Sequence, residues 1–381
     1  DRKNQHLLPV FLLICVSAVI YFNTLSNGFV YDDLGTIVEN VHIKRFSNYL
    51  SSFYNPSYFK ISGGEASYRP VATLSYYLLY AIFDVNPFGY HLTSFALHIL
   101  NVILVYLMAF VILGDRQSSV FAGLLFACHP VNAEAVNGVS YNEDLLAAFF
   151  FFLAFLSYMR LQPSAPKPGY IRFILSLFFF LLGLLSKEMA ITLPAIVVLY
   201  DLTLREPASS KISINRILEV VQERKYVYVG FLGVSLFYLW LRFFAMYNPE
   251  EVEKQIWGRL IDRVIYLPVI FLKYIKLNLF PFPLNADYVF SYPTRFLDIL
   301  PLLSLLVVLG LVIYSFFALR NAKAVSFGIW WFFITLFPVY NLIQIYNPFA
   351  ERYMYIPLWG FCLVISIFLE TLLRRISFSW A

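Results

Sequence analysis

The stretch NGFVYDDLGTIVEN, residues 27–40, places two adjacent carboxylates, Asp32 and Asp33, just past the first long apolar run. A carboxylate in this position can take a proton from an attacking hydroxyl group. Ionisable residues at a membrane edge are expensive and are functional candidates by default. The pair therefore indicates a catalytic site, with the cap of an interfacial helix as the structural alternative.

Other ionisable residues lie near the ends of the later apolar runs, and the topology given below collects them on the same side as Asp32. Carboxylates alone would suggest a path for cations. Carboxylates mixed with Lys and Arg indicate acid–base chemistry beside an anionic group such as phosphate, whose charge the cations stabilise as it leaves. The candidates are Asp33, Arg69, His91, His129, Glu134, Glu143, Asp144, Lys187, Glu188, Asp287, Tyr288, Glu351 and Arg352.

Each candidate also has a structural interpretation. His98 lies seven residues after His91 on the same helix face and deeper in the membrane, and we interpret it as a buried hydrogen-bonded side chain. Lys187 and Glu188 are able to form a simple ion pair in a loop, and Arg352 is able to pair with Glu351, although a lone surface pair stabilises little. No single motif decides between these readings, so the functional interpretation rests on the convergence of the whole set.

The elements that must position these residues are membrane helices. Of the 381 residues, 60% are hydrophobic and 13% are charged, about half the usual charged content. A helix needs roughly 17–25 apolar residues to cross a bilayer, and about ten stretches approach that length. The sequence predicts an all-α polytopic membrane protein, one domain over residues 1–381. The expected spans are 7–22, 92–113, 118–135, 145–161, 171–186, 189–204, 226–246, 299–319, 325–340 and 354–373.

Basic residues favour short cytoplasmic loops, which sets the expected orientation. With the N-terminus in the cytoplasm, the cytoplasmic side holds 15 of the 28 Lys and Arg and 7 of the 23 Asp and Glu, a net charge of +8. The outer side then carries a net charge of −3 and two long loops, residues 23–91 and 247–298. The first apolar run resembles a signal peptide but lacks a convincing cleavage site, so we expect it to be retained.

Two apolar segments in the outer loops are expected to lie along the interface. Residues 261–280 carry Arg263, Lys273 and Lys276, and these cations can reach the lipid headgroups from an interfacial helix. A full crossing there, the alternative, would invert every later span. The segment RPVATLSYYLLYAIF, residues 69–83, is the second such helix.

Cysteine spacing and charge exclude some classes of site. Cys15, Cys128 and Cys362 have neither metal-ligand nor disulfide spacing and are expected to be packing residues. No basic stripe with interleaved aromatic residues indicates nucleic-acid binding.

Several motifs in order resemble one family. They are FVYDD, YRPVATLSYYL, NPFGYHLTSFALHILN, FACHPVNAEAVNGVSYNEDLLAA, SKEMAITLPAIVVLYD, LNADY and AERYMYIP, and they run from about residue 27 to residue 373. The chain resembles the membrane region of the transmembrane and tetratricopeptide-repeat-containing O-mannosyltransferases. The resemblance implies the GT-C glycosyltransferase fold with ten or eleven spans. The repeat region of that family is absent from this chain, which fits a truncated protein.

The resemblance implies roles for particular residues. Asp32 acts at the reacting centre with Asp33 as its neighbour. A second acid maps onto Asp144 or the adjacent Glu143, because SYNED replaces the family's usual sequence there and leaves the choice open. Lys187 is expected near the donor phosphate.

Two further cations are candidates for the phosphate of the donor. Arg352 of the AERY motif is a plausible second contact, and Arg69 is a third basic residue on the same side. No metal is expected to be required, although Asp32, Asp33 and Asp144 could bind Mg²⁺ or Mn²⁺ through oxygen ligands.

The implied activity is transfer of a sugar, mannose in this family, from a polyprenyl-phosphate donor to a Ser or Thr hydroxyl group with inversion. The site would face the periplasm of a bacterial inner membrane or the lumen of the endoplasmic reticulum. Alternatives are a glycolipid or polysaccharide acceptor, a secondary transporter and a non-catalytic scaffold. A transporter predicts internal repeats and charges near mid-membrane, whereas no repeat is evident here and most charges lie at the outer edge.

Overall fold

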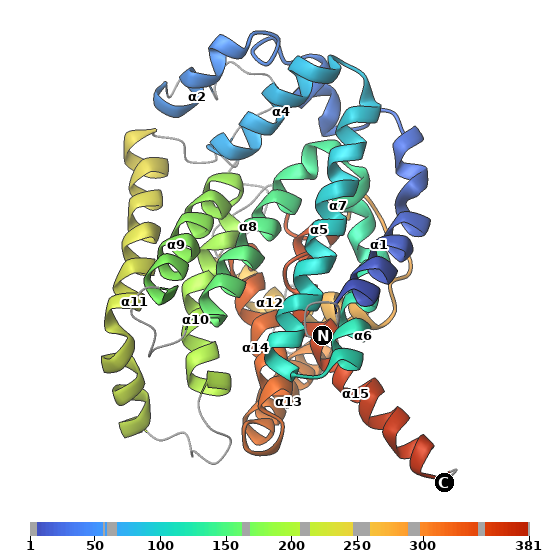
Figure 1. The fold of residues 1–381 in the computed structure, drawn as a ribbon, viewed down its shortest axis with the longest axis vertical. Helices are drawn as coiled ribbons and strands as arrows, with labels where there is room; N and C mark the ends of the chain where they lie inside the picture. The colour runs from blue at the N-terminus through green and yellow to red at the C-terminus, as the bar shows by residue number, and fades with distance from the viewer. Residues whose placement is uncertain are drawn as a thin grey trace.

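The computed structural model describes residues 6–55, 58, 67–161, 168–205, 214–246, 260–288, 298–341 and 347–379, and these residues form helices without any strand. Figure 1 shows a helical bundle with α2 and α4 across one end. The α-helices are α1 (Leu7–Tyr21), α2 (Ser51–Tyr54), α4 (Pro70–Phe83), α5 (Pro87–Leu113), α6 (Arg116–Cys128), α7 (Ala133–Asn137), α8 (Asn142–Met159), α9 (Pro168–Ser186), α10 (Leu193–Tyr200), α11 (Ile214–Trp240), α12 (Leu260–Leu279), α13 (Ile299–Asn321), α14 (Lys323–Leu336) and α15 (Leu358–Ser379).

Short 3-10 and π segments join the long helices and carry much of the polar chemistry. They are η1 (Phe22–Ser26), η2 (Leu34–Val38), η3 (Phe46–Leu50), η4 (Pro130–Asn132), η5 (Val139–Tyr141), η6 (Glu188–Thr192), η7 (Asp201–Arg205), η8 (Leu241–Ala245), η9 (Phe337–Val339) and η10 (Glu351–Met354). Such short segments are frequent at the ends of α-helices and as connectors between them.

Local sequence explains where the helices start and stop. The Asn86 side chain accepts the N–H of Phe88 at the start of α5, and Pro87 is the first residue of that helix. Gly114 ends α5 in the left-handed conformation, at φ 66°. Asp115 then caps α6 by accepting the N–H of Ser118. These are standard capping arrangements, so the α5–α6 turn is encoded locally.

Six of the predicted spans correspond to helices that are long and apolar enough to cross a bilayer. The protein is therefore an integral membrane protein. The number of candidate spans rises to seven if α6 and the following segment, residues 130–137, are counted as one span with a bend of 51° between them. The predicted count of ten is not confirmed over the described residues. The six helices are Leu7–Ser26, Pro87–Leu113, Val139–Met159, Gly169–Ser186, Ile214–Ala245 and Ile299–Asn321.

The remaining predicted spans are shorter, bent or more charged than the sequence suggested. The run 189–204 is divided among η6, α10 and η7, and α14 has only 14 residues. Although α15 is 22 residues long, Glu370, Arg374 and Arg375 lie in its second half.

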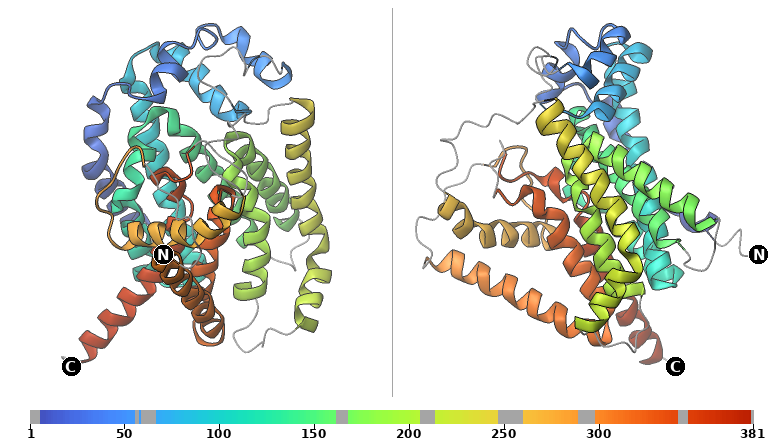
Figure 2. Two further views of the ribbon diagram at one scale, coloured as in Figure 1. Left: turned by 180° about the vertical axis from the view of Figure 1, so that it is seen from behind. Right: turned by 90° about the vertical axis from the view of Figure 1, so that its left-hand side faces the viewer.

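The two segments that were expected to lie along the interface are helical, as α4 and α12. In Figure 1, α4 lies at the end of the bundle with α2. In both views of Figure 2, α12 runs across the direction of α11. Neither α4 nor α12 is among the six candidate spans, in keeping with the expectation that residues 261–280 lie along the interface.

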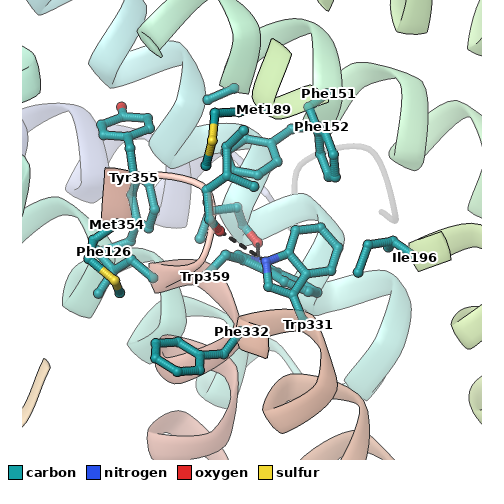
Figure 3. Packing of buried hydrophobic residues seen from close by; sticks show 14 of the residues in the cluster. Phe126, Phe151, Phe152, Met189, Ile196, Trp331, Phe332, Met354, Tyr355 and Trp359 are labelled. Carbon is teal, nitrogen blue, oxygen red and sulfur yellow. Dashed lines mark hydrogen bonds between the residues drawn. The ribbon is translucent and has the colours of Figure 1, made fainter. Parts of the chain in front are cut away.

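An aromatic core joins α8, α14 and α15 and supports η6, as Figure 3 shows. The rings of Trp331 and Trp359 are 4.3 Å apart between centroids, and the Trp331 indole donates to the Ile356 carbonyl over 2.9 Å. At the crossing of α14 and α15, a Cβ at Gly360 would come within 2.4 Å of the Gly328 carbonyl oxygen. Only glycine therefore permits this close approach.

The three cysteines are free thiols. Cys362 is fully buried in the core, as expected for a packing residue, and Cys15 is partly buried. Cys128 is exposed, so the prediction of a packing role does not hold for it.

Candidate functional site

Six charged side chains from four separate segments meet where α4, α8, η6 and η8 approach one another. The structure thus brings together five of the predicted residues and adds one that the sequence analysis did not single out, Arg242. We call this set the acid–base cluster: Arg69, Glu143, Asp144, Lys187, Glu188 and Arg242.

Arg69, the residue before α4, ties two carboxylates together. Its Nη1 lies 2.7 Å from both carboxylate oxygens of Glu143, and its Nη2 and Nε donate to Glu188 over 2.7 and 3.2 Å. The planar guanidinium suits such paired contacts with carboxylates. Arg69 therefore fixes the start of α4 to α8 and η6 at once.

Arg242 completes the contacts of Glu188. Its Nη1 donates to Glu188 Oε2 over 2.9 Å and to the Tyr238 hydroxyl over 3.0 Å. Burial alone would raise the pKa of Glu188, but the guanidinium groups of Arg69 and Arg242 hold it well below its usual range. A charged residue near the end of an apolar run is costly, and that signal in LRFFA could have identified Arg242 from the sequence.

Lys187 is buried between two carboxylates of α8. Its Nζ lies 2.6 Å from Asp144 Oδ2 and 2.8 Å from Glu143 Oε1, and its side chain is 5% exposed. Burial disfavours the ammonium, but Asp144 and Glu143 outweigh that effect and raise the pKa of Lys187. The ammonium is thus held in a fixed place and remains charged.

Arg352 lies next to the cluster and pairs with Glu134, not with Glu351 as the structural alternative suggested. Its Nη1 donates to one oxygen of Glu134 and its backbone N–H to the other, the latter over 2.8 Å. Its guanidinium lies 4.3 Å from the ring centroid of Tyr141. Arg352 and Lys187 both lie near the ring of Tyr353, at 5.1 and 5.8 Å from its centroid, so the two cations face the same region.

The two adjacent aspartates have different surroundings. Asp33 is buried, and its two oxygens accept backbone N–H groups from Ser140 at 2.7 Å and Val30 at 3.1 Å. Asp32 is exposed, and within the described part of the chain it makes no hydrogen bond or ion pair. Asp33 is therefore an anchor for the backbone, whereas Asp32 offers a solvated carboxylate.

Asp32 and the two cations lie near the same tyrosine. Tyr141 interacts electrostatically with Asp32 and also with Lys187 and Arg352. Tyr31, directly before Asp32, has φ 48°, a conformation that is uncommon for a residue with a side chain. Such strain often accompanies functional sites, and here it sits beside the exposed carboxylate.

The remaining predicted residues have other partners. His91 contacts the Thr24 hydroxyl and the Gly28 carbonyl, each at 3.4 Å, and His129 contacts the Asn278 carbonyl at 3.1 Å. Both histidines therefore tie a helix to a neighbouring loop.

A second polar group lies around Glu351. One oxygen of Glu351 accepts the backbone N–H of Asn285 at 2.7 Å and the Tyr288 hydroxyl at 2.6 Å, and Asp287 is exposed nearby in the chain. Burial is the main cause that raises the pKa of Glu351. Glu351 thus holds the 285–288 segment against η10.

Asp33 and Asp144, two of the three carboxylates that the sequence offered as metal ligands, are used in other ways. Both Asp33 oxygens accept backbone N–H groups, and Asp144 pairs with Lys187. Among the residues that the structure describes, no three His, Cys, Asp or Glu side chains are grouped so as to hold a metal ion.

Comparison with known proteins gives a consistent result. Residues 68–218 match the family model described as dolichyl-phosphate-mannose-protein mannosyltransferase. The chain is 33% identical over 270 residues to the protein O-mannosyl-transferase Tmtc1 of Drosophila melanogaster. This match covers 66% of this chain and 31% of that protein. It is 34% identical over 228 residues to human TMTC2, covering 58% of this chain and 26% of that protein.

The chain is a relative of the protein O-mannosyl-transferases. The resemblance drawn from the sequence motifs is thereby confirmed. The chain spans less than a third of the length of these curated relatives.

The fold comparison agrees with the GT-C architecture expected from the sequence. The archaeal oligosaccharyltransferase AglB from Archaeoglobus fulgidus, solved in complex with an inhibitory peptide and a dolichol-phosphate, superposes with a TM-score of 0.51. The two are 13% identical, and the match covers 99% of this chain and 52% of AglB. This relative of the O-mannosyl-transferases therefore has the helical GT-C fold.

Proposed function

We propose that this protein is a membrane glycosyltransferase that moves a sugar from a polyprenyl-phosphate donor to a Ser or Thr hydroxyl group of a protein. The names of its relatives favour mannose as the sugar. The observation that carries the proposal is an exposed Asp32 that has no hydrogen-bond or ion-pair partner among the described residues and that lies near Tyr141, as do the buried cations Lys187 and Arg352. That arrangement supplies a base and a phosphate site, the two parts that the reaction needs.

Lys187 and Arg352 are suited to hold the donor phosphate. An ammonium has three N–H donors, and Glu143 and Asp144 take two of those of Lys187. A guanidinium has five, and Glu134 engages one Nη group of Arg352. Both cations thus keep donors for phosphate oxygens while their carboxylate partners fix their positions. Arg69 supports this arrangement through Glu143.

The reaction is a single displacement. Asp32 accepts the proton of the acceptor hydroxyl, whose oxygen attacks the anomeric carbon of the sugar. The bond between that carbon and the phosphate oxygen breaks, and polyprenyl phosphate leaves with the electron pair, stabilised by Lys187 and Arg352. One displacement inverts the anomeric configuration. No metal takes part in any step of this proposal.

The site is proposed to open on the non-cytoplasmic side, with the N-terminus in the cytoplasm. The distribution of Lys and Arg among the loops supports this orientation. This orientation is compatible with a periplasmic site in a bacterial inner membrane or a lumenal site in the endoplasmic reticulum.

The test uses purified protein, a radiolabelled polyprenyl-phosphate mannose and a Ser/Thr-containing peptide. Asp32→Asn is expected to lower turnover about 10²- to 10⁴-fold, the usual contribution of a general base, without lowering the melting temperature. The matched control is Asp298→Asn, because Asp298 is also an exposed aspartate but precedes α13. Unchanged turnover in Asp32→Asn would disprove the role of Asp32. Transfer to a peptide with all its Ser and Thr residues replaced by Ala would disprove the acceptor class.

A further inference from the structure

The Arg352 guanidinium is held by more than its ion pair with Glu134. It lies over the ring of Tyr141 at 4.3 Å and near the ring of Tyr353 at 5.1 Å, measured to the ring centroids. Arg352 is 8% exposed, so water competes little with these contacts. A cation over an aromatic face is attracted by the ring, and the attraction grows when the pair is desolvated.

Ser140, the residue before Tyr141, is held by two hydrogen bonds to the segment that connects α1 and α5. The Ser140 N–H donates to Asp33 Oδ1 over 2.7 Å, and the Ser140 carbonyl accepts the Tyr76 hydroxyl over 2.7 Å. Asp33 and Tyr76 are 1% and 2% exposed. Buried hydrogen bonds to both backbone polar groups of Ser140 leave η5 little freedom, so the backbone that carries Tyr141 is fixed.

We propose that Tyr141 is a positioning residue that holds Arg352 at the donor phosphate, and that Tyr76 and Asp33 position Tyr141 through Ser140. This proposal rests on the function proposed above. It gives the second aspartate of the YDD motif a role that differs from that of the first. Asp32 accepts a proton from the acceptor, whereas Asp33 positions Arg352 indirectly, through Ser140 and Tyr141.

The ring, and not the hydroxyl group, is the part of Tyr141 that the proposal needs. Tyr141→Phe keeps the aromatic face, so its KM for the donor is expected to stay within about twofold of wild type. Tyr141→Leu removes the face, and its KM for the donor is expected to rise about fivefold to thirtyfold, with kcat changed less. Tyr314→Phe, a change at an exposed position on α13, is the control for the loss of a tyrosine hydroxyl group.

The role of the hydrogen bonds to Ser140 is tested by a double-mutant cycle. Tyr76→Phe removes the hydrogen bond to the Ser140 carbonyl and is expected to raise the donor KM about twofold to fivefold, the effect of one hydrogen bond. Because Tyr76 acts through Tyr141, the same change in the Tyr141→Leu background is expected to add no further increase. Full additivity of the two changes would overturn this role.

Direct binding of polyprenyl phosphate to the detergent-solubilised protein separates this inference from the proposed function. If wild type does not bind the lipid, the proposed donor site is wrong. If wild type binds it and Tyr141→Leu binds it equally well, the positioning role of Tyr141 is wrong. Equal loss of donor affinity in Tyr141→Phe and Tyr141→Leu would also overturn it, because the aromatic face would then be irrelevant. Melting temperatures confirm that each variant is folded.

Discussion

Two clusters of charged side chains contact the two ends of α8, one at Asp144 and the other at Tyr158, which are about 14 residues and thus about 20 Å apart along the helix. The acid–base cluster is at the start of the helix. At its other end Asp201 accepts hydrogen bonds from the hydroxyl groups of Tyr158 and Tyr228 and pairs with Arg205 over 3.1 Å. Arg205 in turn lies over the ring of Tyr158 at 4.9 Å. We call these four residues the Asp201 cluster.

The comparison teaches that burial and charge balance do not by themselves mark a functional site. The acid–base cluster pairs three carboxylates with three cations, and the Asp201 cluster pairs one with one. The two clusters differ in the residues that lie beside them. Beside the acid–base cluster lie the exposed Asp32 and the partly engaged Arg352. The Asp201 carboxylate is enclosed by its own hydrogen bonds, which is typical of a structural anchor.

The largest effect is expected for Lys187→Met. Removing this cation leaves Glu143 and Asp144 facing each other in a buried place, so unfolding should become easier by about 4 kcal/mol, the usual cost of breaking a buried pair. Turnover should fall at least about a hundredfold even after correction for the folded fraction, because phosphate stabilisation is lost. Denaturant titration and the transfer assay measure the two effects, and wild-type turnover per folded molecule would contradict the assignment of Lys187.

Asp201→Asn tests whether the Asp201 cluster has only a structural role. It leaves Arg205 without its carboxylate, and we expect a loss of about 2–3 kcal/mol in unfolding free energy, typical of hydrogen bonds to a charged group. The kcat and the donor KM of the folded protein should not change. A selective rise in the donor KM would show that the Asp201 cluster is part of the catalytic machinery and would remove the distinction drawn here.

Arg69→Lys is expected to have an intermediate effect. Lysine keeps the positive charge but cannot reproduce the paired contacts of the guanidinium with Glu143 and Glu188. The melting temperature should fall by an amount that corresponds to about 1–2 kcal/mol, the scale of charged hydrogen bonds. Arg172→Lys, near the start of α9, is the control and should change little, because the Arg172 guanidinium donates an exposed hydrogen bond to the Arg160 carbonyl.

The smallest effect is a change in pH dependence. The folded-state pKa of Glu188 lies well below 4.5, since Arg69 and Arg242 outweigh the effect of burial. The ionised carboxylate therefore stabilises the fold fully above about pH 4.5, and that stability is lost as the pH falls through the folded-state pKa. Glu188→Gln should lower the melting temperature at neutral pH. It should also make the melting temperature fall less as the pH is lowered. An unchanged acid dependence would mean that another group is responsible.

Much of the fold followed from the sequence because hydropathy and capping are local properties. Six of the predicted spans are helices of sufficient length. Asn86 caps the start of α5, and Gly114 and Asp115 encode the α5–α6 turn. The motifs also gave the family and five members of the acid–base cluster. The count of spans did not follow, because 3-10 and π segments break apolar runs that look continuous in the sequence.

The sequence by itself determined that many acids and bases lie near the ends of apolar runs, because ionisable groups are excluded from the lipid-facing parts of helices. Only the tertiary structure decided which of them are paired. It bound Asp33 to Ser140 and left Asp32 exposed, and it gave Arg352 to Glu134, which lies 218 residues away, in place of its neighbour Glu351. Ion pairs and hydrogen bonds depend on distance in space, and these segments meet only after the helices have packed.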